Sequence, residues 1–381
     1  MKSTINSKND LRKFNVFLFV STFARSLIEI FISLYLFKNG FSIQSVLTFY
    51  LLENLFSFFI SILFVKIGEK YNYAVVMYAG VISFIVLQVV LGNLVHSFWY
   101  ISLISLLYAV YRRGYWVSRR FYITNIMPEK GSTVPYSIVM VVSEIASILS
   151  GFVGAYLLDG LNVTTLMVIS SILLFISVLP LRKIKANGNR TKIELIKNLK
   201  KYDKRNFIAF SLYEINNLIS FIFPIYVYLY IEGTYKMAGS MNAVSNVAII
   251  IFIFLYGRII KKKNFFIMST LLFIVVCFSK LIFLNYFILA ICFIEGIVKK
   301  MQNQSLGKIY FENRNGMDLA HYNLIYQLLE AVARVVATIP LLFMNDVRIM
   351  IITVLGIITV ELIIYTIINK SKKTRKSAIL S

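Results

Sequence analysis

Long apolar runs separated by short polar segments make up most of the chain. A helix needs about 20 predominantly apolar residues to cross a bilayer, and each run reaches that length once a few embedded charges are tolerated. The first run is too long for the core of a signal peptide and has no small-residue cleavage site, so we expect an uncleaved first helix. The runs predict membrane spans at residues 14–37, 44–65, 73–91, 98–118, 137–158, 163–181, 207–231, 237–256, 265–283, 286–307, 322–344 and 349–368.

Several polar positions of the second half of the chain repeat those of the first half at an offset of roughly 186 to 193 residues. A parallel repeat of six helices is typical of transporters whose substrate site lies between the repeats. We therefore predict an all-α membrane protein with two pseudo-symmetric six-helix bundles, residues 1–181 and 206–381, joined by a basic linker, residues 182–205. The matching positions are Asn54 and Asn246, Arg112–Arg113 and Lys299–Lys300, and Glu144 and Glu330.

Composition agrees with this class of protein. Hydrophobic residues make up 59% and charged residues 15% of the 381 residues, and the mean hydropathy is +0.76. Twelve spans use roughly 240 residues, so no room remains for a soluble enzyme domain. Cys277 and Cys292 lie inside apolar runs, and the two histidines fall in no zinc or nucleophile motif. We expect no enzymatic activity, no metal and no cofactor.

The net charge of +23 could indicate a nucleic-acid partner, but the placement of the bases argues otherwise. Of 40 Lys and Arg residues, 30 lie on the side that holds both termini and the linker, 3 lie in loops on the other side, and 7 lie within spans. Loops rich in Lys and Arg stay in the cytoplasm. The pattern predicts a multi-pass protein of the cell membrane with cytoplasmic termini and no nucleic-acid partner.

The loops after the second and eighth spans read FVKIGEKYNY and YGRIIKKKN. With the six-plus-six pattern and the basic central segment, they resemble the major facilitator superfamily, whose signature in these loops combines an acid, bases and glycines. The resemblance covers the whole chain. It implies a gating role for Glu69, Lys70 and Arg258, although Asn72 stands where the family usually has glycine. It also implies a transporter that works as a monomer in the lipid bilayer.

Fourteen ionisable residues lie within the spans, seven of each sign. One such group at the bilayer centre costs roughly 2.5–3.5 kcal/mol on insertion scales, so they must pair, change protonation or line water. Two lie near span ends, Lys280 and Glu361, and we expect them to reach the membrane interface. Three pairs are four residues apart, which places both members on one helix face and makes a purely structural role an open alternative. They are Arg25 with Glu29, Glu295 with Lys299, and Glu330 with Arg334.

Arg112 and Arg113 have no acid within four positions on their own helix. Neutralising groups must then come from other helices, with Glu29, Glu144 or an anionic substrate as candidates. The alternative is that the long side chains reach the headgroup region. Adjacent residues diverge by about 100° around a helix, so we expect only one of the two to face a cavity.

In the superfamily, the first, fourth, seventh and tenth helices line the central cavity, and the resemblance nominates polar residues there. The run KKMQNQS makes the tenth helix too polar for lipid, so it lines the cavity or ends early. A carboxylate next to an arginine can exchange its proton when substrate displaces the partner. The candidates for substrate binding are Arg25, Arg112, Arg113, Asn216, Asn217, Lys299, Gln302 and Asn303, and those for proton coupling are Glu29, Glu144, Glu214 and Glu330.

The charged residues within the spans predict a secondary active transporter that is coupled to protons. Export of a small amphipathic, drug-like or peptide-like molecule is what the resemblance to the superfamily implies. Uptake of a zwitterionic nutrient or siderophore-like compound is one alternative. Flipping of a lipid-linked molecule and a receptor without transport are two others. No phosphate-binding loop for ATP is present in the sequence.

Overall fold

The protein is all-helical in the residues that its computed structural model describes, which are 7–126, 133–160, 163–183, 204–231, 234–259, 265–283, 287–312 and 319–380. Residues 184–203 of the predicted linker lie outside them. The first half of the chain forms α1 (Ser7–Glu29), α2 (Ile32–Lys38), α3 (Ile43–Lys70), α4 (Tyr73–Leu91), α5 (Phe98–Ile126), α6 (Thr133–Gly160), α7 (Val163–Ser177) and the short η1 (Leu179–Lys183). The second half forms α9 (Lys204–Tyr230), α10 (Tyr235–Ile259), α11 (Phe266–Ile282), α12 (Ile288–Glu312), α13 (Leu319–Thr338), η2 (Ile339–Phe343) and α14 (Val347–Leu380).

Helical segments in the described residues coincide with the apolar runs of the sequence. Nine of them are long and apolar enough to cross a membrane. The predicted spans at α5, α11 and α12 are also helical, but α11 has only 17 residues, and α5 and α12 carry several bases. Large apolar side chains such as Phe59, Val89 and Phe175 are more than 60% exposed, whereas Glu53 and Arg113 are buried. Apolar groups outside and charges inside are the distribution of a protein whose solvent is lipid.

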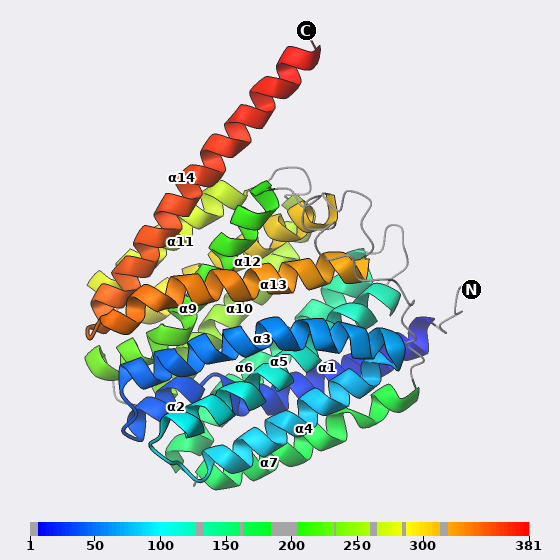
Figure 1. The fold of residues 1–381 in the computed structure, drawn as a ribbon, viewed down its shortest axis with the longest axis vertical. Helices are drawn as coiled ribbons and strands as arrows, with labels where there is room; N and C mark the ends of the chain where they lie inside the picture. Colours follow the sequence, from blue (N-terminus) through cyan, green and yellow to red (C-terminus); the bar gives the residue numbers. More distant parts are fainter. Residues whose placement is uncertain are drawn as a thin grey trace.

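Consecutive spans run antiparallel, with α1 and α2 together forming the first span, so the molecule has two ends (Figure 1). We call the end at which α1 begins the terminal face and the other end, which holds Phe41 and Met344, the distal face. Helices from the two halves of the chain lie next to each other chiefly where α3 packs against α13 and α6 against α10, and α2 also contacts α9. The last helix, α14, continues beyond the body of the molecule at its C-terminal end (Figure 1).

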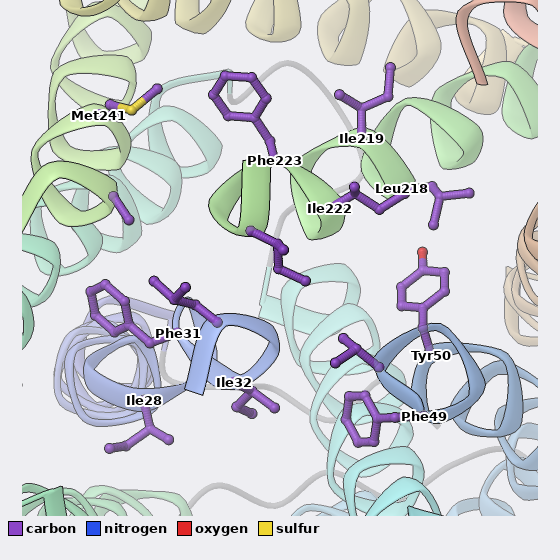
Figure 2. Close-up of a cluster of buried hydrophobic side chains, with 14 of the residues drawn as sticks. Ile28, Phe31, Ile32, Phe49, Tyr50, Leu218, Ile219, Ile222, Phe223 and Met241 are labelled. Carbon is purple, nitrogen blue, oxygen red and sulfur yellow. The ribbon is translucent and has the colours of Figure 1, made fainter. Parts of the chain in front are cut away.

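Apolar side chains from both halves of the chain pack together toward the distal face. Figure 2 shows Leu218 of α9 next to Tyr50 of α3, and the ring of Phe221, also on α9, lies 4.4 Å from the Tyr50 ring. At the distal face itself, the Gln44 amide donates to the carbonyl oxygens of Met344 (3.1 Å) and Asn345. The halves are therefore joined at this end by apolar packing and by hydrogen bonds.

Glycines allow two pairs of helices to approach closely. A Cβ atom on Gly114 of α5 would lie 2.8 Å from the Gly80 Cα atom of α4, and one on Gly239 of α10 would overlap the Ala155 Cβ atom of α6. Small residues at such crossings let backbones pack in a bilayer, where no hydrophobic force joins helices. Gly239 thus brings the two halves together along α6 and α10.

Candidate functional site

Glu330 of α13 lies at the centre of a cluster of arginines. Its carboxylate is 2.9 Å from the guanidinium of Arg334, 3.3 Å from those of Arg112 and Arg113, and 3.9 Å from that of Arg120. Arg334 is on the same helix, four residues on, and this pairing confirms the sequence prediction. The other three arginines come from α5, so one carboxylate ties the second half of the chain to the first.

The cluster extends through further acids on both sides. Arg112 also pairs with Glu53 of α3 at 2.8 Å, and Arg334 pairs with Glu214 of α9. We call this continuous set of ion pairs the central network. Its members are Glu53, Arg112, Arg113, Glu214, Glu330 and Arg334.

Arg112 and Arg113 correct two expectations. Neither reaches Glu29 or Glu144: their acidic partners are Glu53 and Glu330. Neither side chain extends to the headgroup region, because Arg112 is only 14% and Arg113 only 1% exposed. Both also touch the same carboxylate although they diverge around the helix. The long guanidinium arms compensate for the 100° between adjacent positions.

Hydrogen bonds hold Glu214 in place within the network. Its carboxylate accepts from the Tyr326 hydroxyl at 2.8 Å and from the Asn217 amide at 3.0 Å. The Tyr326 ring lies 4.5 Å from the Arg120 guanidinium. Several donors therefore converge on Glu214 and Glu330. Because Arg334 pairs with both acids, a change in either acid alters the contacts between α9 and α13.

A second charged pair lies at the end of α1. Arg25 pairs with Glu29 at 2.9 Å, as the spacing predicts, and the Tyr108 hydroxyl of α5 donates to the other oxygen of Glu29 at 2.8 Å. The Arg25 guanidinium also lies 4.9 Å from the Tyr115 ring. Glu29 is the last residue of α1, and a turn separates it from α2. A break in a spanning helix next to a carboxylate is a frequent feature of functional sites in transporters.

Lysines on α11 and α12 share one acid. Glu295 pairs with Lys299 at 2.9 Å, as predicted, and also with Lys280 of α11. Lys280 is 3% exposed, so the expectation that it reaches the membrane interface is wrong. Its ammonium lies 4.0 Å from the Phe223 ring of α9. The acid that attracts it is on the neighbouring helix, which spacing along the chain does not reveal.

Two weaker polar contacts join α6 to the second half of the chain. Glu144 lies 3.9 Å from the Lys300 ammonium, and the Ser147 hydroxyl accepts from the Asn246 amide at 3.0 Å. Glu144 and Glu330, which correspond in the repeat, thus both face bases of the opposite half.

The remaining nominated residues are distributed between α9 and α12. The Asn216 amide donates to Gln302 at 2.9 Å, and the Gln302 amide donates to the Thr270 hydroxyl at 3.0 Å. Asn303 follows Gln302 and is half-buried. All are helical, because α12 continues to Glu312. Of the two alternatives for the tenth span, lining the cavity or ending early, the second therefore does not hold.

The proposed gating residues lie at helix ends. Glu69 and Lys70 form the last turn of α3, where the Lys70 ammonium lies 5.0 Å from the Tyr71 ring. Arg258 belongs to the last turn of α10, and its side chain lies outside the described side chains.

Several residues of the site were not selected from the sequence. Glu53 and Asn54 are fully buried on α3, and the side-chain oxygen of Asn54 accepts from Arg334 at 3.5 Å. Tyr108 and Tyr326 each donate to a candidate carboxylate. Glu53 and Asn54 could have been selected from the sequence, because polar residues within a long apolar run are unusual. Tyr108 and Tyr326 could not, because they look like ordinary aromatic residues of a membrane protein.

A groove of about 480 Å³ lies apart from these charges, between α1 and α6 near the terminal face. It is lined mostly by apolar residues and includes one base. The lining residues are Leu11, Arg12, Asn15, Val16, Phe19, Val20 and Val142. Among the described residues, no group of three His, Cys, Asp or Glu side chains is arranged to hold a metal ion.

Comparisons with known proteins identify the class. The family model of the Major Facilitator Superfamily matches residues 15–334. The chain therefore belongs to this superfamily, and it is a multi-pass membrane transporter rather than an enzyme. None of the curated proteins matches it in sequence.

Solved structures of transporters share the fold. One is a point mutant of the nucleoside transporter NupG, with 13% sequence identity and a TM-score of 0.66 over 94% of this chain and 99% of that chain. Another is a bacterial homologue of the iron transporter ferroportin in an outward-facing state, with 11% identity and a TM-score of 0.65 over 94% of this chain and 98% of that chain. A third is PepTSo, a transporter of the POT family (9%, 0.73, 96% and 98%). At these identities the likeness concerns the fold alone.

Proposed function

We propose that the protein is a proton-coupled secondary transporter that exports a small amphipathic organic molecule across the cell membrane. In this proposal twelve spans form two six-helix bundles, α1 to α7, of which α1 and α2 make one span, and α9 to α14. Both termini and the terminal face are cytoplasmic. The 30 to 3 distribution of Lys and Arg supports this orientation. The transporter works as a monomer.

The observation that carries the proposal is the position of Glu330 between the two halves. Three arginines of α5 and Arg334 of α13 surround this one buried carboxylate. Removing one partner from a buried ion pair leaves the other charge uncompensated at a cost of several kcal/mol. Protonation of Glu330 removes its negative charge, and it therefore weakens the connection between α5 and α13. A proton thus acts directly on the contact between the bundles.

We expect the substrate to compete with the carboxylates of the protein for their basic partners. Arg25, Arg112, Arg113 and Lys299 each hold a carboxylate in the present arrangement, and an anionic group of the substrate can take its place. The displaced Glu29 or Glu330 then accepts a proton more readily, because the neighbouring positive charge no longer favours its ionised form. Glu214 pairs with Arg334, and Glu144 lies near Lys300. Each of these acids would likewise accept a proton more readily once its basic partner is displaced.

A transporter of this kind alternates between a state open to the cytoplasm and a state open to the outside. The contacts between the two halves must therefore break at the terminal face in one state and at the distal face in the other. The distal end is joined mainly by apolar side chains and by the contacts of Gln44, which break without exposing charge (Figure 2). The amides of Asn216, Asn217 and Gln302 make polar contacts on the α9 and α12 side, and Asn303 follows Gln302 on α12. Glu69, Lys70 and Arg258 lie at helix ends on the terminal face, where they would gate the cytoplasmic opening.

The apolar groove between α1 and α6 supports an amphipathic cargo. It lies near the terminal face, and its lining is mostly apolar but includes Arg12. A molecule dissolved in the cytoplasmic leaflet can lie in this groove before it reaches the centre, which favours export over uptake.

The test uses everted membrane vesicles with an acidic interior and a fluorescent amphipathic compound. Vesicles with the wild-type protein should accumulate the compound, whereas Glu330→Gln should abolish accumulation. Glu361→Gln is a matched control, because Glu361 is also an acid within a span but contacts only Ser211 of α9 among the described residues. Equal accumulation by wild type and Glu330→Gln would exclude the proposed role of Glu330.

A further inference from the structure

The lysine cluster on α11 and α12 holds more positive than negative charge. Glu295 is the one acid within ion-pair distance of Lys280 and Lys299 among the residues that the structure describes. The cluster thus contains two ammonium groups and one carboxylate. A charge left without a partner inside a bilayer is costly and generally marks a substrate or ion pathway.

The surroundings show which ammonium is in excess. The Lys280 side chain is 4% exposed, pairs with Glu295 and lies against the Phe223 ring. The Lys299 side chain is 26% exposed, and its ammonium is shared between Glu295 at 2.9 Å and the Ser220 hydroxyl of α9 at 2.7 Å. Lys280 is enclosed and neutralised, whereas Lys299 is accessible and has a neutral hydroxyl as its other partner.

Lys299 also lies deep in the molecule. It is the twelfth residue of the 25-residue helix α12, so about 17 Å of helix or more separates it from either end. A side chain midway along the helix therefore lies far from both ends of α12. The ammonium faces α9, as its contact with Ser220 shows, and α9 is a helix that also carries Glu214 of the central network.

We propose that Lys299 and Ser220 form the subsite for a negatively charged group, most simply a carboxylate, on the transported molecule. This rests on the proposed transport function and narrows its substrate to an organic anion or to a zwitterion bound through its negative end. An ammonium and a hydroxyl together donate two hydrogen bonds to one carboxylate, and bonds that involve charged groups are the stronger kind. If the anionic group binds at Lys299 rather than at Arg112 or Arg113, the central network stays intact and Glu330 can take up the proton.

The purified protein in detergent tests this inference without any proton gradient. Thermal unfolding, followed by the fluorescence of Trp99 and Trp116, is measured with two matched sets: benzoate, benzamide and benzylamine, and octanoate, octanamide and octylamine. The carboxylates should raise the melting temperature, and the amides and amines should not. Lys299→Gln should weaken carboxylate binding roughly ten- to a hundredfold. Lys299→Arg should retain it because arginine stays charged.

Lys236→Gln is the matched control, since Lys236 is an exposed lysine at the distal end of α10. Stabilisation by an amine or amide equal to that by its carboxylate, or undiminished carboxylate binding by Lys299→Gln, would overturn the inference. If none of the six compounds binds, the inference is tested by comparing the melting temperatures of the ligand-free wild type and Lys299→Gln. Lys299→Gln should then unfold at a higher temperature than wild type because it removes the surplus charge, and unfolding at the same or a lower temperature contradicts the inference.

The outcome is separable from that of the proposed function. Carboxylate binding that depends on Lys299, found together with transport that ignores a pH gradient, refutes only the proton coupling. Gradient-driven transport of a cation or neutral compound refutes only the anion subsite.

Discussion

Arg112 and Glu330 face each other across the two halves of the chain, with Nη2 and Oε1 3.3 Å apart and both side chains largely buried. Arg112 simultaneously holds Glu53 of its own half, and Glu330 simultaneously holds Arg334 of its own half. Each residue therefore forms one ion pair within its own half and one with the other half. This arrangement makes the contact between the halves sensitive to a single proton, and it leads to predictions about stability as well as transport.

Glu330→Gln should lower the stability of the protein markedly. The change leaves the surrounding arginines without their shared carboxylate, and breaking a buried ion pair costs about 3–5 kcal/mol. The melting temperature in detergent should fall by several degrees, while Glu361→Gln should change it little. An unchanged melting temperature for Glu330→Gln would mean that the arginines are neutralised by other groups.

Arg112→Ala should destabilise the protein more than Arg113→Ala, although Arg113 is the more buried residue. Without Arg112, the fully buried Glu53 keeps only the hydroxyl of Ser57 as a partner among the described side chains. Without Arg113, Glu330 still has Arg112 and Arg334. The double variant Glu53→Gln, Arg112→Ala should recover part of the loss, because it removes the stranded charge. Equal effects of the two single variants would argue against the network as described.

Glu29→Gln should separate coupling from movement. Its carboxylate contacts Arg25 and Tyr108, and both can still hydrogen-bond to an amide, so the fold should survive. Uphill transport driven by a pH gradient should be lost, whereas exchange of labelled for unlabelled compound across proteoliposomes should continue. Tyr108→Phe, which keeps the titratable group, should retain both activities at a reduced rate. Intact uphill transport in Glu29→Gln would remove Glu29 from the proton pathway.

Gly114→Ala should disturb the packing of α4 against α5. The added Cβ atom would lie 2.8 Å from the Gly80 Cα atom and from the Val76 carbonyl oxygen. Overpacking of this kind costs about 1–3 kcal/mol. Gly160→Ala is the control, because nothing lies within 4 Å of its added Cβ atom. Thermal unfolding should show a loss only for Gly114→Ala, and equal melting temperatures would show that α4 and α5 can move apart freely.

A disulfide across the distal face should arrest the transporter. Gln44 and Asn345 are in hydrogen-bond contact, and the two native cysteines are buried. Oxidation of the variant Gln44→Cys, Asn345→Cys should block transport, and a reducing agent should restore it. The single variant Gln44→Cys should be insensitive to both treatments. Continued transport by the fully oxidised double variant would show that the distal face need not open.

The sequence was sufficient for those parts of the structure that depend on one helix at a time. Run lengths predicted where helices occur, and spacing of four predicted the pairs of Glu29, Glu295 and Glu330 correctly, because such residues share a helix face. Partners on different helices could not be predicted this way. Arg112 meets Glu53 because of how α3 and α5 rotate and pack, and Lys280 is drawn inward by Glu295 on the adjacent helix.

The orientation of each helix about its own axis is set by packing of all its neighbours at once. The small residues that determine this packing, such as Gly80 and Gly114, are visible in the sequence, but their partners are not. Tyr108 and Tyr326 show the same limit, since a tyrosine becomes part of a site only when a carboxylate lies within reach of its hydroxyl. The roles of all these residues in substrate binding and proton transfer are predictions that the variants above test.

Transport by the wild-type protein in proteoliposomes, measured with and without a pH gradient while the membrane voltage is clamped, tests proton coupling most directly. A library of fluorescent amphipathic compounds that includes organic anions serves as substrate. The account predicts that at least one compound accumulates against its concentration gradient only when the pH gradient is present, and that adding it moves protons in the opposite direction. Accumulation that is equal with and without the pH gradient for every transported compound would contradict the account.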